Sequence, residues 1–568
     1  MKNLIKKSVI VLTYIALVGS ANGQVKTVSP STVSKVWVAD NGDGTYKNPI
    51  LHADYSDPDV IRVGDDFYLT SSSFNSAPGL PILHSKDLVN WEIIGHVFNI
   101  QPPVARYDSL QHGNGVWAPA IRFHNGEFYI YYPDPDIGIY MVKAKNPAGP
   151  WSAPLLIKKA LGWIDPCPIW DTDGNAYLIN GMAASRSGIK TTLILNRMSA
   201  DGTKLLDDGT IVFDGHDKNP TIEGPKIYKI NGYYYILAPA GGVGEGWQLA
   251  MRSKNIYGPY EQKIVLAQGN AATNGPHQGG LVDTQTGEWW FIHFQDKDAY
   301  GRIVHLEPVK WVNKWPIIGI DKDGKGIGEP VLTYKKPNVG KTYPIMTPAE
   351  SDEFNGNQLG LQWQWEANPK TNWMFPAGSA YGFLRLYNVL LPSGIKNYWQ
   401  VPNLLTQKFP ADNFSATTKF TFTLRGDGEE TGLIITGIDY AYLSVKKKPG
   451  GLFISQTICT NAEGGKPEKK SDEIEVKSNT LYFKVDVKNV DPTSSDYNTF
   501  KTSSASKWGN AACTFSYSTD GVNFIKVGDA FPARKGKWVG AKVGIFATRT
   551  NKINEEGYAD FDWFRIGK

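Results

Sequence analysis

Residues 57–70 read DPDVIRVGDDFYLT: a short apolar strand, a turn with Gly and Asp, and an aromatic strand. The plan is a polar or small residue, usually with a proline, followed by a β-hairpin. It recurs four more times. The later copies begin with APAIR at 118–122, DPCPI at 165–169, EGPKI at 223–227 and HQGGL at 277–281. Their aromatic strands are FYIY at 128–131, AYLI at 176–179, YYYI at 233–236 and WWFI at 289–292.

The copies begin 47 to 61 positions apart. A period of roughly 50 residues built from hairpins is typical of β-propeller blades and not of helical solenoids. Turn residues between the paired strands support the hairpins, as at Asn125-Gly126 and Asn231-Gly232. Five unrelated hairpins of a sandwich are the alternative, which the shared position of the leading residue disfavours. The repeats predict a five-bladed β-propeller over residues 45–333.

The repeated hairpin pattern ends after residue 333, and the composition of the sequence changes. Residues 334–349 include a basic stretch with proline and glycine, which predicts a linker. Residues 350–568 contain alternating apolar positions, such as Phe420 and Phe422 or Phe483 and Val485. Such alternation is typical of half-buried antiparallel strands, so we expect a β-sandwich here. Counts of 18 Trp, 28 Tyr, 24 Phe and 58 Gly agree with an all-β protein.

The N-terminus predicts export. Residues 1–23 carry Lys2, Lys6 and Lys7, an apolar run over 9–18 and small residues at the end, as in a cleaved signal peptide. An uncleaved anchor is the weaker interpretation, because the run is short for a bilayer. These lysines supply three units of the net charge of +4, so the mature chain is nearly neutral. We therefore expect neither nucleic acid nor membrane as a partner, and a periplasmic or extracellular location.

Three cysteines are too few for a disulfide framework in so long a chain. Cys459 and Cys513 could pair in the oxidising compartment. Cys167 would then stay single, and we expect it to be a buried structural thiol.

The blade geometry brings acidic residues together. The first strand of each blade starts near the propeller axis, so Asp57, Asp165 and Glu223 should share one mouth of the propeller, with His277 beside them. Three neighbouring carboxylates repel one another, which raises the pKa of at least one and keeps it protonated near neutral pH. Such a set suits acid/base hydrolysis of a glycosidic bond.

Several motifs in this order resemble glycoside hydrolase family 43: YSDPD at 55–59, PGLPILHSKDLVNW at 78–91, GVWAP at 115–119, IEGP at 222–225 and GR at 301–302. The C-terminal part resembles the concanavalin-like jelly-roll sandwich of the family's β-xylosidase branch. The resemblance implies a five-bladed propeller and an inverting hydrolase, such as a β-xylosidase, an α-L-arabinofuranosidase or an arabinanase. The chain departs from the family at Ala120, where many members carry Asp.

The resemblance also implies roles for single residues. Asp57 corresponds to the general base that activates water and Glu223 to the general acid, while Asp165 corresponds to the carboxylate that orients the acid and raises its pKa. An inverting pair leaves room for water, so we expect the carboxyls of Asp57 and Glu223 to lie about 6.5–9.5 Å apart. Phe74 and Trp117 correspond to aromatic walls of the substrate pocket, and Arg302 to a substrate-binding arginine.

His277 has two interpretations besides that of a structural histidine. In some relatives the equivalent histidine holds a calcium ion through water, and in others it contacts sugar. Clustered His and Cys ligands are missing from the sequence, so we expect no catalytic metal and no required cofactor, with a structural calcium left open.

We therefore predict an exported inverting exo-glycosidase that releases α-L-arabinofuranosyl or β-D-xylosyl residues from xylan- or arabinoxylan-derived substrates. An endo-arabinanase and a non-catalytic carbohydrate-binding propeller are the alternatives. The sequence leaves the preferred sugar and the oligomeric state open. It also leaves open whether the sandwich binds sugar through Trp363, Trp365 or Trp373, for which core packing is the favoured use.

Overall fold

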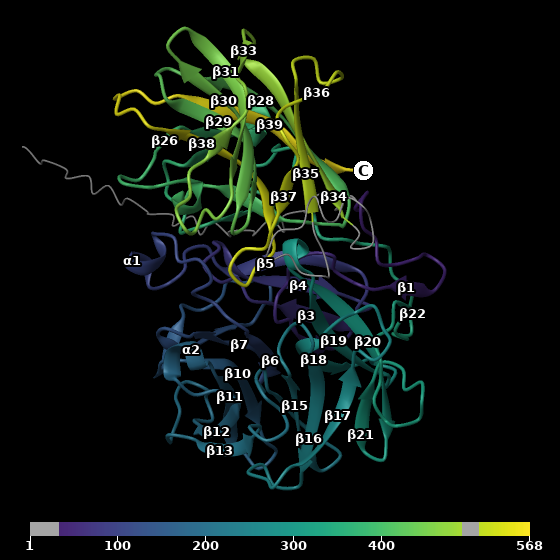
Figure 1. Ribbon diagram of the computed structural model, residues 1–568. Helices are drawn as coiled ribbons and strands as arrows, with labels where there is room; N and C mark the ends of the chain where they lie inside the picture. The colour runs from purple at the N-terminus through teal and green to yellow at the C-terminus, as the bar shows by residue number, and fades with distance from the viewer. Residues whose placement is uncertain (1–32, 491–510) are drawn as a thin grey trace, which may run out of the picture.

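The computed structural model describes residues 33–490 and 511–568, which are almost entirely β-structure (Figure 1). Five four-stranded antiparallel sheets within these residues form the blades of a β-propeller. The five predicted hairpins are the first two strands of the five blades, so this prediction is confirmed. The signal-peptide prediction for residues 1–23 lies outside the described residues.

Each blade uses four consecutive strands. Blade 1 contains β2 (Asp59–Val63), β3 (Asp66–Thr70), β4 (Gly79–Ser85) and β5 (Trp91–Phe98). Blade 2 contains β6 (Ala120–His124), β7 (Glu127–Asp134), β8 (Gly138–Ala144) and β9 (Leu155–Lys159). Blade 3 contains β10 (Trp163–Trp170), β11 (Ala176–Met182), β12 (Thr192–Met198) and β13 (Thr210–Asp214). Blade 4 contains β14 (Lys226–Ile230), β15 (Tyr233–Ala240), β16 (Trp247–Ser253) and β17 (Glu261–Ala267). Blade 5 contains β18 (His277–Asp283), β19 (Trp289–Asp296), β20 (Arg302–Val312) and β21 (Trp315–Ile318).

The first strands of the blades surround the propeller axis. Strand β2 contacts β6 and β18, β6 contacts β10, and β10 contacts β14. Apolar side chains between neighbouring blades form the propeller core, as where Ile179 of blade 3 and Ile236 of blade 4 belong to one buried cluster. Strands β1 (Thr45–Lys47) and β22 (Thr333–Lys335) pair antiparallel and join the two ends of this region.

The sandwich consists of two facing sheets, which are antiparallel except where the short strand β26 pairs parallel with β38. One sheet contains, in order, β23 (Gln364–Trp365), β27 (Leu405–Lys408), β38 (Lys542–Arg549), β29 (Glu429–Thr436), β30 (Tyr440–Lys448), β31 (Gly451–Cys459) and β32 (Lys469–Lys470), with β26 (Val389–Leu390) beside β38 and β33 (Ile474–Val476) beside β31. The other contains, in order, β24 (Met374–Pro376), β25 (Leu384–Tyr387), β39 (Tyr558–Gly567), β28 (Phe414–Thr423), β34 (Thr480–Asn489), β35 (Ala511–Ser518) and β36 (Ile525–Lys526), with β37 (Phe531–Ala533) beside β35.

Helical structure within residues 33–490 and 511–568 is confined to single turns: α1 (Val104–Tyr107), α2 (Ala184–Ser187), α3 (Gly378–Tyr381), and the 3-10 turns Asp298–Tyr300 and Tyr398–Gln400. No helix in the described part of the chain is long and apolar enough to cross a membrane.

Three tryptophans and two cysteines that the sequence analysis singled out in the C-terminal half are buried in the sandwich. Trp363, Trp365 and Trp373 are buried in it, so their side chains serve packing, as the sequence favoured. The pairing of Cys459 with Cys513 is wrong: both are free thiols, and they lie on β31 and β35 in different sheets. Cys167 is also a free, buried thiol, as expected.

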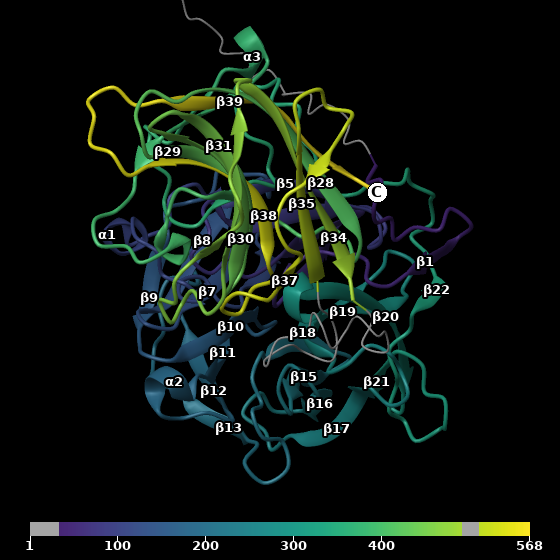
Figure 2. The ribbon, with the colours of Figure 1, turned by 45° about the horizontal axis from the view of Figure 1, so that its top comes forward.

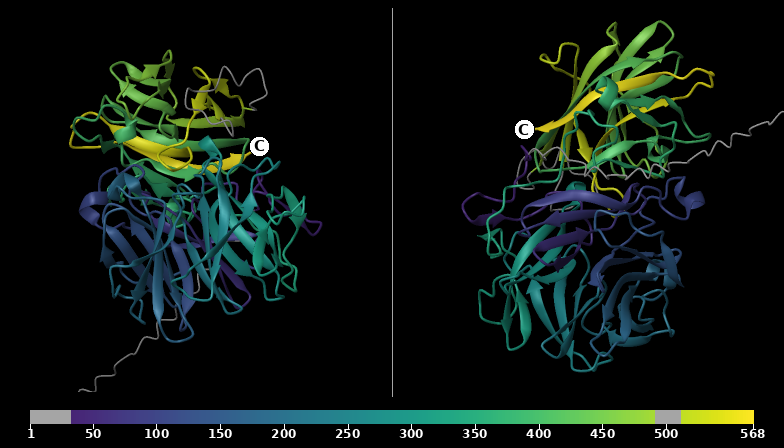
Figure 3. Two further views of the ribbon diagram at one scale, coloured as in Figure 1. Left: turned by 60° about the horizontal axis from the view of Figure 1, so that its bottom comes forward. Right: turned by 180° about the vertical axis from the view of Figure 1, so that it is seen from behind.

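The sandwich sits on one end of the propeller (Figures 2 and 3). Ala299, Tyr300 and Ile303 of blade 5 belong to the buried cluster of the sandwich, so the two domains share a core. Ala77 of the propeller pairs with Trp365 in an isolated β-bridge. Lys542 of β38 donates to Ser76 Oγ at 2.9 Å and forms a buried ion pair with Glu366 at 2.8 Å.

Candidate active site

The predicted acidic residues lie where the first strands of their blades begin. Asp57 and Glu223 stand just before β2 and β14, and Asp165 lies near the start of β10. Asp57 and Asp165 both have a left-handed backbone, with φ of 54° and 57°. Asp adopts this conformation more readily than most residues, because its short side chain can form local hydrogen bonds. The repeated strand start therefore gives two blades the same local geometry.

Hydrogen bonds hold the carboxylate of Asp57 on both oxygens. Oδ2 accepts from Ser56 Oγ at 3.0 Å and Ser72 Oγ at 2.6 Å, while Oδ1 accepts from Arg302 Nη1 at 2.9 Å. The Arg302 contact is a buried ion pair. Charge-assisted bonds of this kind are short and directional, so the orientation of the carboxylate is fixed.

Asp165 and Glu223 lie near each other, and the charge of Asp165 raises the pKa of Glu223. Asp165 Oδ2 accepts from the backbone N–H of Gly224 at 2.7 Å. Gly181 of β11 touches both sites, since a Cβ there would lie 3.6 Å from Glu223 Cα and 3.7 Å from Asp165 Oδ2. Burial raises the pKa of Asp165, and the charge of Asp57 raises it further.

The pKa of Glu223 is raised to about 8, further than that of Asp165, which is raised to about 6. Burial of its carboxyl is the main cause, and the charge of Asp165 adds to it, while the Arg302 cation acts in the opposite direction. Its side chain remains 32% exposed, so the carboxyl can be reached from solvent. Glu223 is therefore a carboxylic acid that keeps its proton at a pH where an ordinary glutamate has lost it.

His277 lies beside this acid in a dry environment. Its Nε2 is 3.4 Å from Glu223 Oε1, and neither ring nitrogen has a hydrogen-bond partner among the described residues. Burial lowers the pKa of His277 to about 3, and Arg302 contributes to this shift. The imidazole is neutral. It can donate to or accept from a sugar hydroxyl in the site.

The described residues around His277 include no complete set of protein ligands for a calcium ion. Calcium takes six to eight oxygen ligands. The described residues contain no group of three or more His, Cys, Asp or Glu side chains that could hold a metal. The Arg302 cation contributes to the lowered pKa of His277, and its positive charge would also repel a metal ion at this histidine.

The two predicted aromatic residues differ in exposure. Phe74 is buried at 3% exposure and pairs through its backbone with Val116, directly before Trp117. Trp117 is partly exposed, and its Nε1 donates to Gly113 O at 2.9 Å. The Arg186 guanidinium lies 5.1 Å from the centre of the Trp117 ring.

A third aromatic residue comes from the sandwich and was missed by sequence reasoning. Trp538 lies in the loop between β37 and β38, which reaches down to the propeller (Figure 1). Its ring meets the Trp117 ring edge-on at 5.9 Å and lies 5.8 Å from the Arg302 guanidinium. The side chain is 50% exposed. The sandwich thus adds an aromatic wall beside the carboxylates.

Asp54, another residue that sequence reasoning missed, joins this loop to the site. Its Oδ1 accepts from the backbone N–H of Arg302 at 2.8 Å, and its Oδ2 accepts from that of Gly540 at 2.9 Å. Gly540 packs so closely that a Cβ there would lie 2.7 Å from Gly301 N. Asp54 and Gly540 are 486 positions apart, so no local pattern could have revealed the contact.

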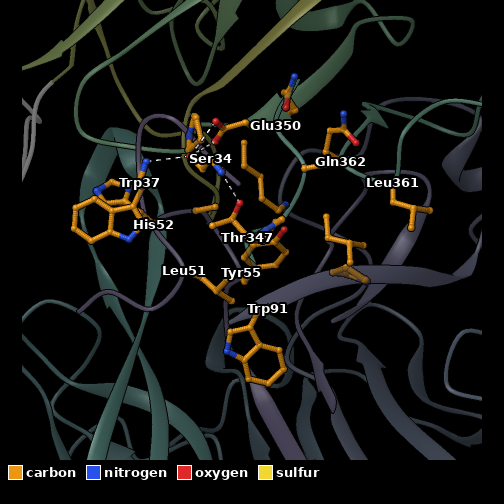
Figure 4. A pocket seen from close by; sticks show the side chains of 18 of the residues that line it. Ser34, Trp37, Leu51, His52, Tyr55, Trp91, Thr347, Glu350, Leu361 and Gln362 are labelled. Carbon is orange, nitrogen blue, oxygen red and sulfur yellow. Dashed lines mark hydrogen bonds between the residues drawn. The ribbon is translucent and has the colours of Figure 1, made fainter. Parts of the chain in front are cut away.

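A separate cavity lies at the seam between the domains (Figure 4). Its volume is about 70 Å³, and its walls come from the N-terminal segment, blade 1, the linker and the sandwich. Ser34 bridges two of these parts, because its Oγ donates to the Glu350 carboxylate and its backbone N–H donates to Thr347 Oγ1 at 2.8 Å. None of the predicted site residues lines it. The carboxylate cluster is therefore the candidate active site.

The comparisons with known proteins agree with this arrangement. Residues 46–316 match the family described as glycosyl hydrolases family 43, and residues 351–567 match the β-xylosidase C-terminal concanavalin A-like domain. A β-xylosidase of Formosa agariphila is 36% identical over 92% of this chain and 90% of its own length.

Two further relatives broaden the picture. A non-reducing end α-L-arabinofuranosidase of Bacteroides ovatus is 32% identical over 70% of this chain and 74% of its own length. The crystal structure of a GH43 protein from Bacillus licheniformis superposes with a TM-score of 0.74 at 26% identity, covering 92% of this chain and 99% of that one.

Proposed function

The chain is a glycosidase of glycosyl hydrolases family 43, and on this premise we propose that it is an inverting exo-hydrolase that releases β-D-xylosyl or α-L-arabinofuranosyl residues from xylan-derived chains. The observation that carries the proposal is that one site contains both a protonated acid, Glu223, and a carboxylate, Asp57, which Arg302 holds in one orientation.

The two groups divide the chemistry between them. Glu223 donates its proton to the glycosidic oxygen as the bond to the sugar breaks. Asp57 takes a proton from a water that attacks the anomeric carbon from the opposite side, which inverts the configuration. Asp165 acts through Glu223, because its charge helps to keep the acid protonated. A separation of about 6.5–9.5 Å between the two carboxyls remains our prediction.

Exo action is supported by the sandwich loop. Trp538 and Trp117 meet beside Arg302, and the backbone of the loop is tied to the propeller through Asp54. A wall on this side suits a pocket that holds the end of a chain better than a groove that holds its middle, which an endo-arabinanase needs. The names of the relatives support pentosyl residues as the cleaved sugars. We also propose that the protein is exported, from the signal-like residues 1–23.

The test uses purified protein with 4-nitrophenyl β-D-xylopyranoside and 4-nitrophenyl α-L-arabinofuranoside, beside the variant Glu223→Gln. We expect release from at least one substrate and a loss of about 10²–10⁴-fold in the variant, because the amide cannot donate the proton. Glu261→Gln is the matched control, since its side chain lies in the same blade at 70% exposure. Activity that survives in Glu223→Gln would overturn the assignment.

A different pattern would favour the other functions. Release from branched arabinan as internal fragments, without activity on either aryl glycoside, would indicate an endo-arabinanase. Binding of xylan without any product would indicate a non-catalytic propeller.

A further inference from the structure

The propeller has a second concave surface at the end of its axis opposite the carboxylates. It is lined by the carboxyl ends of all five first strands, β2, β6, β10, β14 and β18, together with Trp289 of β19. We call it the distal bowl. Its volume is about 710 Å³, within the range of ligand-binding sites in proteins. The first strands are five to eight residues long, which places the bowl roughly 15–25 Å from the carboxylate cluster.

A cluster of polar side chains around Arg122 lies on the propeller axis and separates the distal bowl from the carboxylate cluster. Arg122 Nη1 pairs with Asp59 Oδ2 at 2.6 Å, and its Nη2 donates to Cys167 Sγ at 2.9 Å. The guanidinium also lies 5.4 Å from the centre of the Tyr228 ring. Asp59 and Cys167 are fully buried. A molecule in the distal bowl therefore cannot compete directly for the catalytic site.

Aromatic rings line the bowl. Phe123 lies near the carboxyl end of β6 and is 43% exposed, which is unusual for a large apolar side chain. The His124 ring stacks on the Trp170 ring at 4.5 Å with an angle of 8°, and Trp289 adds a partly exposed indole. Broad rings beside polar groups are the surfaces on which the apolar faces of sugar rings pack.

The charges of the bowl are balanced in pairs. Arg62 pairs with Asp283 at 2.7 Å, Lys229 pairs with Asp171, and Arg122 pairs with Asp59. Burial lowers the pKa of His124, so the imidazole stays neutral. The bowl thus offers hydrogen-bonding groups without excess charge. This matches a neutral polyhydroxylated ligand and not a nucleic acid, a phosphate or a charged peptide.

We propose that the distal bowl is a second, non-catalytic binding site for a neutral pentose polymer of the linear xylan type. The choice of polymer rests on the proposed function. The aromatic rings carry the affinity by packing on sugar faces, and the paired ionic groups at Arg62 and Lys229 bond to sugar hydroxyls. The site would hold the polymer near the enzyme while chain ends enter the catalytic mouth on the other side.

The test is native gel electrophoresis in gels containing linear xylan, with the full chain carrying Glu223→Gln to prevent hydrolysis. Saturating xylobiose in the gel occupies the catalytic site, so the remaining retardation reports the distal bowl. We expect the added variant Phe123→Ala to weaken this retardation about fivefold or more, since a stacking ring is lost. Phe375→Ala is the matched control, because that ring is 53% exposed on β24 of the sandwich and should change nothing.

Measuring turnover as well as binding separates a lost binding site from a misfolded variant and from a failure of the proposed chemistry. Phe123→Ala in the otherwise unaltered enzyme should retain the parent kcat/KM on the aryl glycosides, which shows that the variant is folded. Equal retardation of Phe123→Ala and its parent, or no retardation of the parent, would overturn the distal site. Xylan binding at Phe123 together with inactivity on every glycoside would overturn the proposed function and leave the distal site standing.

Discussion

The surroundings of Glu223 keep its carboxyl group protonated. Burial is the main cause of its raised pKa, and the charge of Asp165 is the next. Asp165 lies close enough to act, since its Oδ2 accepts a hydrogen bond from the backbone N–H of Gly224, the residue after Glu223. A catalytic acid is active only while protonated, so activity falls as the pH rises through the pKa of Glu223. The alkaline limb of the pH profile should therefore lie well above the ordinary range of a glutamate.

The variant Asp165→Asn tests this coupling. The amide removes the negative charge but can still accept the hydrogen bond from Gly224 N. Without that charge the pKa of Glu223 falls, so the alkaline limb of kcat against pH should move to lower pH. The limb should still lie above that of an exposed glutamate, because burial remains. A limb that stays in place or moves to higher pH would contradict the role given to Asp165.

At the scale of elements, the loop between β37 and β38 is the part of the sandwich that reaches the active site. Trp538 contacts Trp117 and Arg302, and Gly540 bonds to Asp54. Removing the ring with Trp538→Ala should raise KM for an aryl xyloside or arabinoside, with about a tenfold loss in kcat/KM, as the wall is lost.

The matching control for the loop is Trp399→Ala. Trp399 also belongs to the sandwich and faces the propeller, but it stacks on His112 at 3.7 Å and not on a residue of the carboxylate cluster. Unchanged KM in Trp538→Ala, or an equal loss in both variants, would show that the loop does not form part of the substrate site.

The sequence predicts the blade hairpins but not the contacts between the two domains. The hairpins of β2 with β3 and of β14 with β15 repeat with their turn residues, so the blades and the positions of Asp57 and Glu223 follow from local pattern. Trp538 and Asp54 have no such repeat, because their roles arise only where two domains meet. The disulfide considered between Cys459 and Cys513 does not form, for a related reason. Two strands in the same half of the chain need not lie in the same sheet, and β31 and β35 do not.

At the scale of the whole molecule, propeller and sandwich form one cooperative structure. Tyr300 and Ile303 of blade 5 are buried in the sandwich core, and Lys297 pairs with Asp412 at 2.6 Å across the seam. Each large apolar side chain left in water costs about 1.5–3 kcal/mol. A propeller cut off before the sandwich would expose several at once, and Asp54 Oδ2 would lose its hydrogen bond from Gly540.

A chain ending at residue 345 tests this dependence. We expect it to be insoluble, or to unfold at a clearly lower temperature and lose most of its activity, when compared with the full chain by thermal melting and aryl glycoside turnover. A truncated propeller with the parent melting temperature and kcat/KM would show that the sandwich is an independent appendage.

The central claim is that Glu223 and Asp57 act as an acid and a base on opposite sides of the glycosidic bond. Proton NMR tests it most directly, by following the anomeric form of the sugar first released from whichever aryl glycoside is cleaved. We expect inversion: a β-D-xyloside should yield α-D-xylose first, or an α-L-arabinofuranoside should yield β-L-arabinofuranose first, each before mutarotation. First release with the substrate's own configuration would indicate a covalent intermediate and contradict the account.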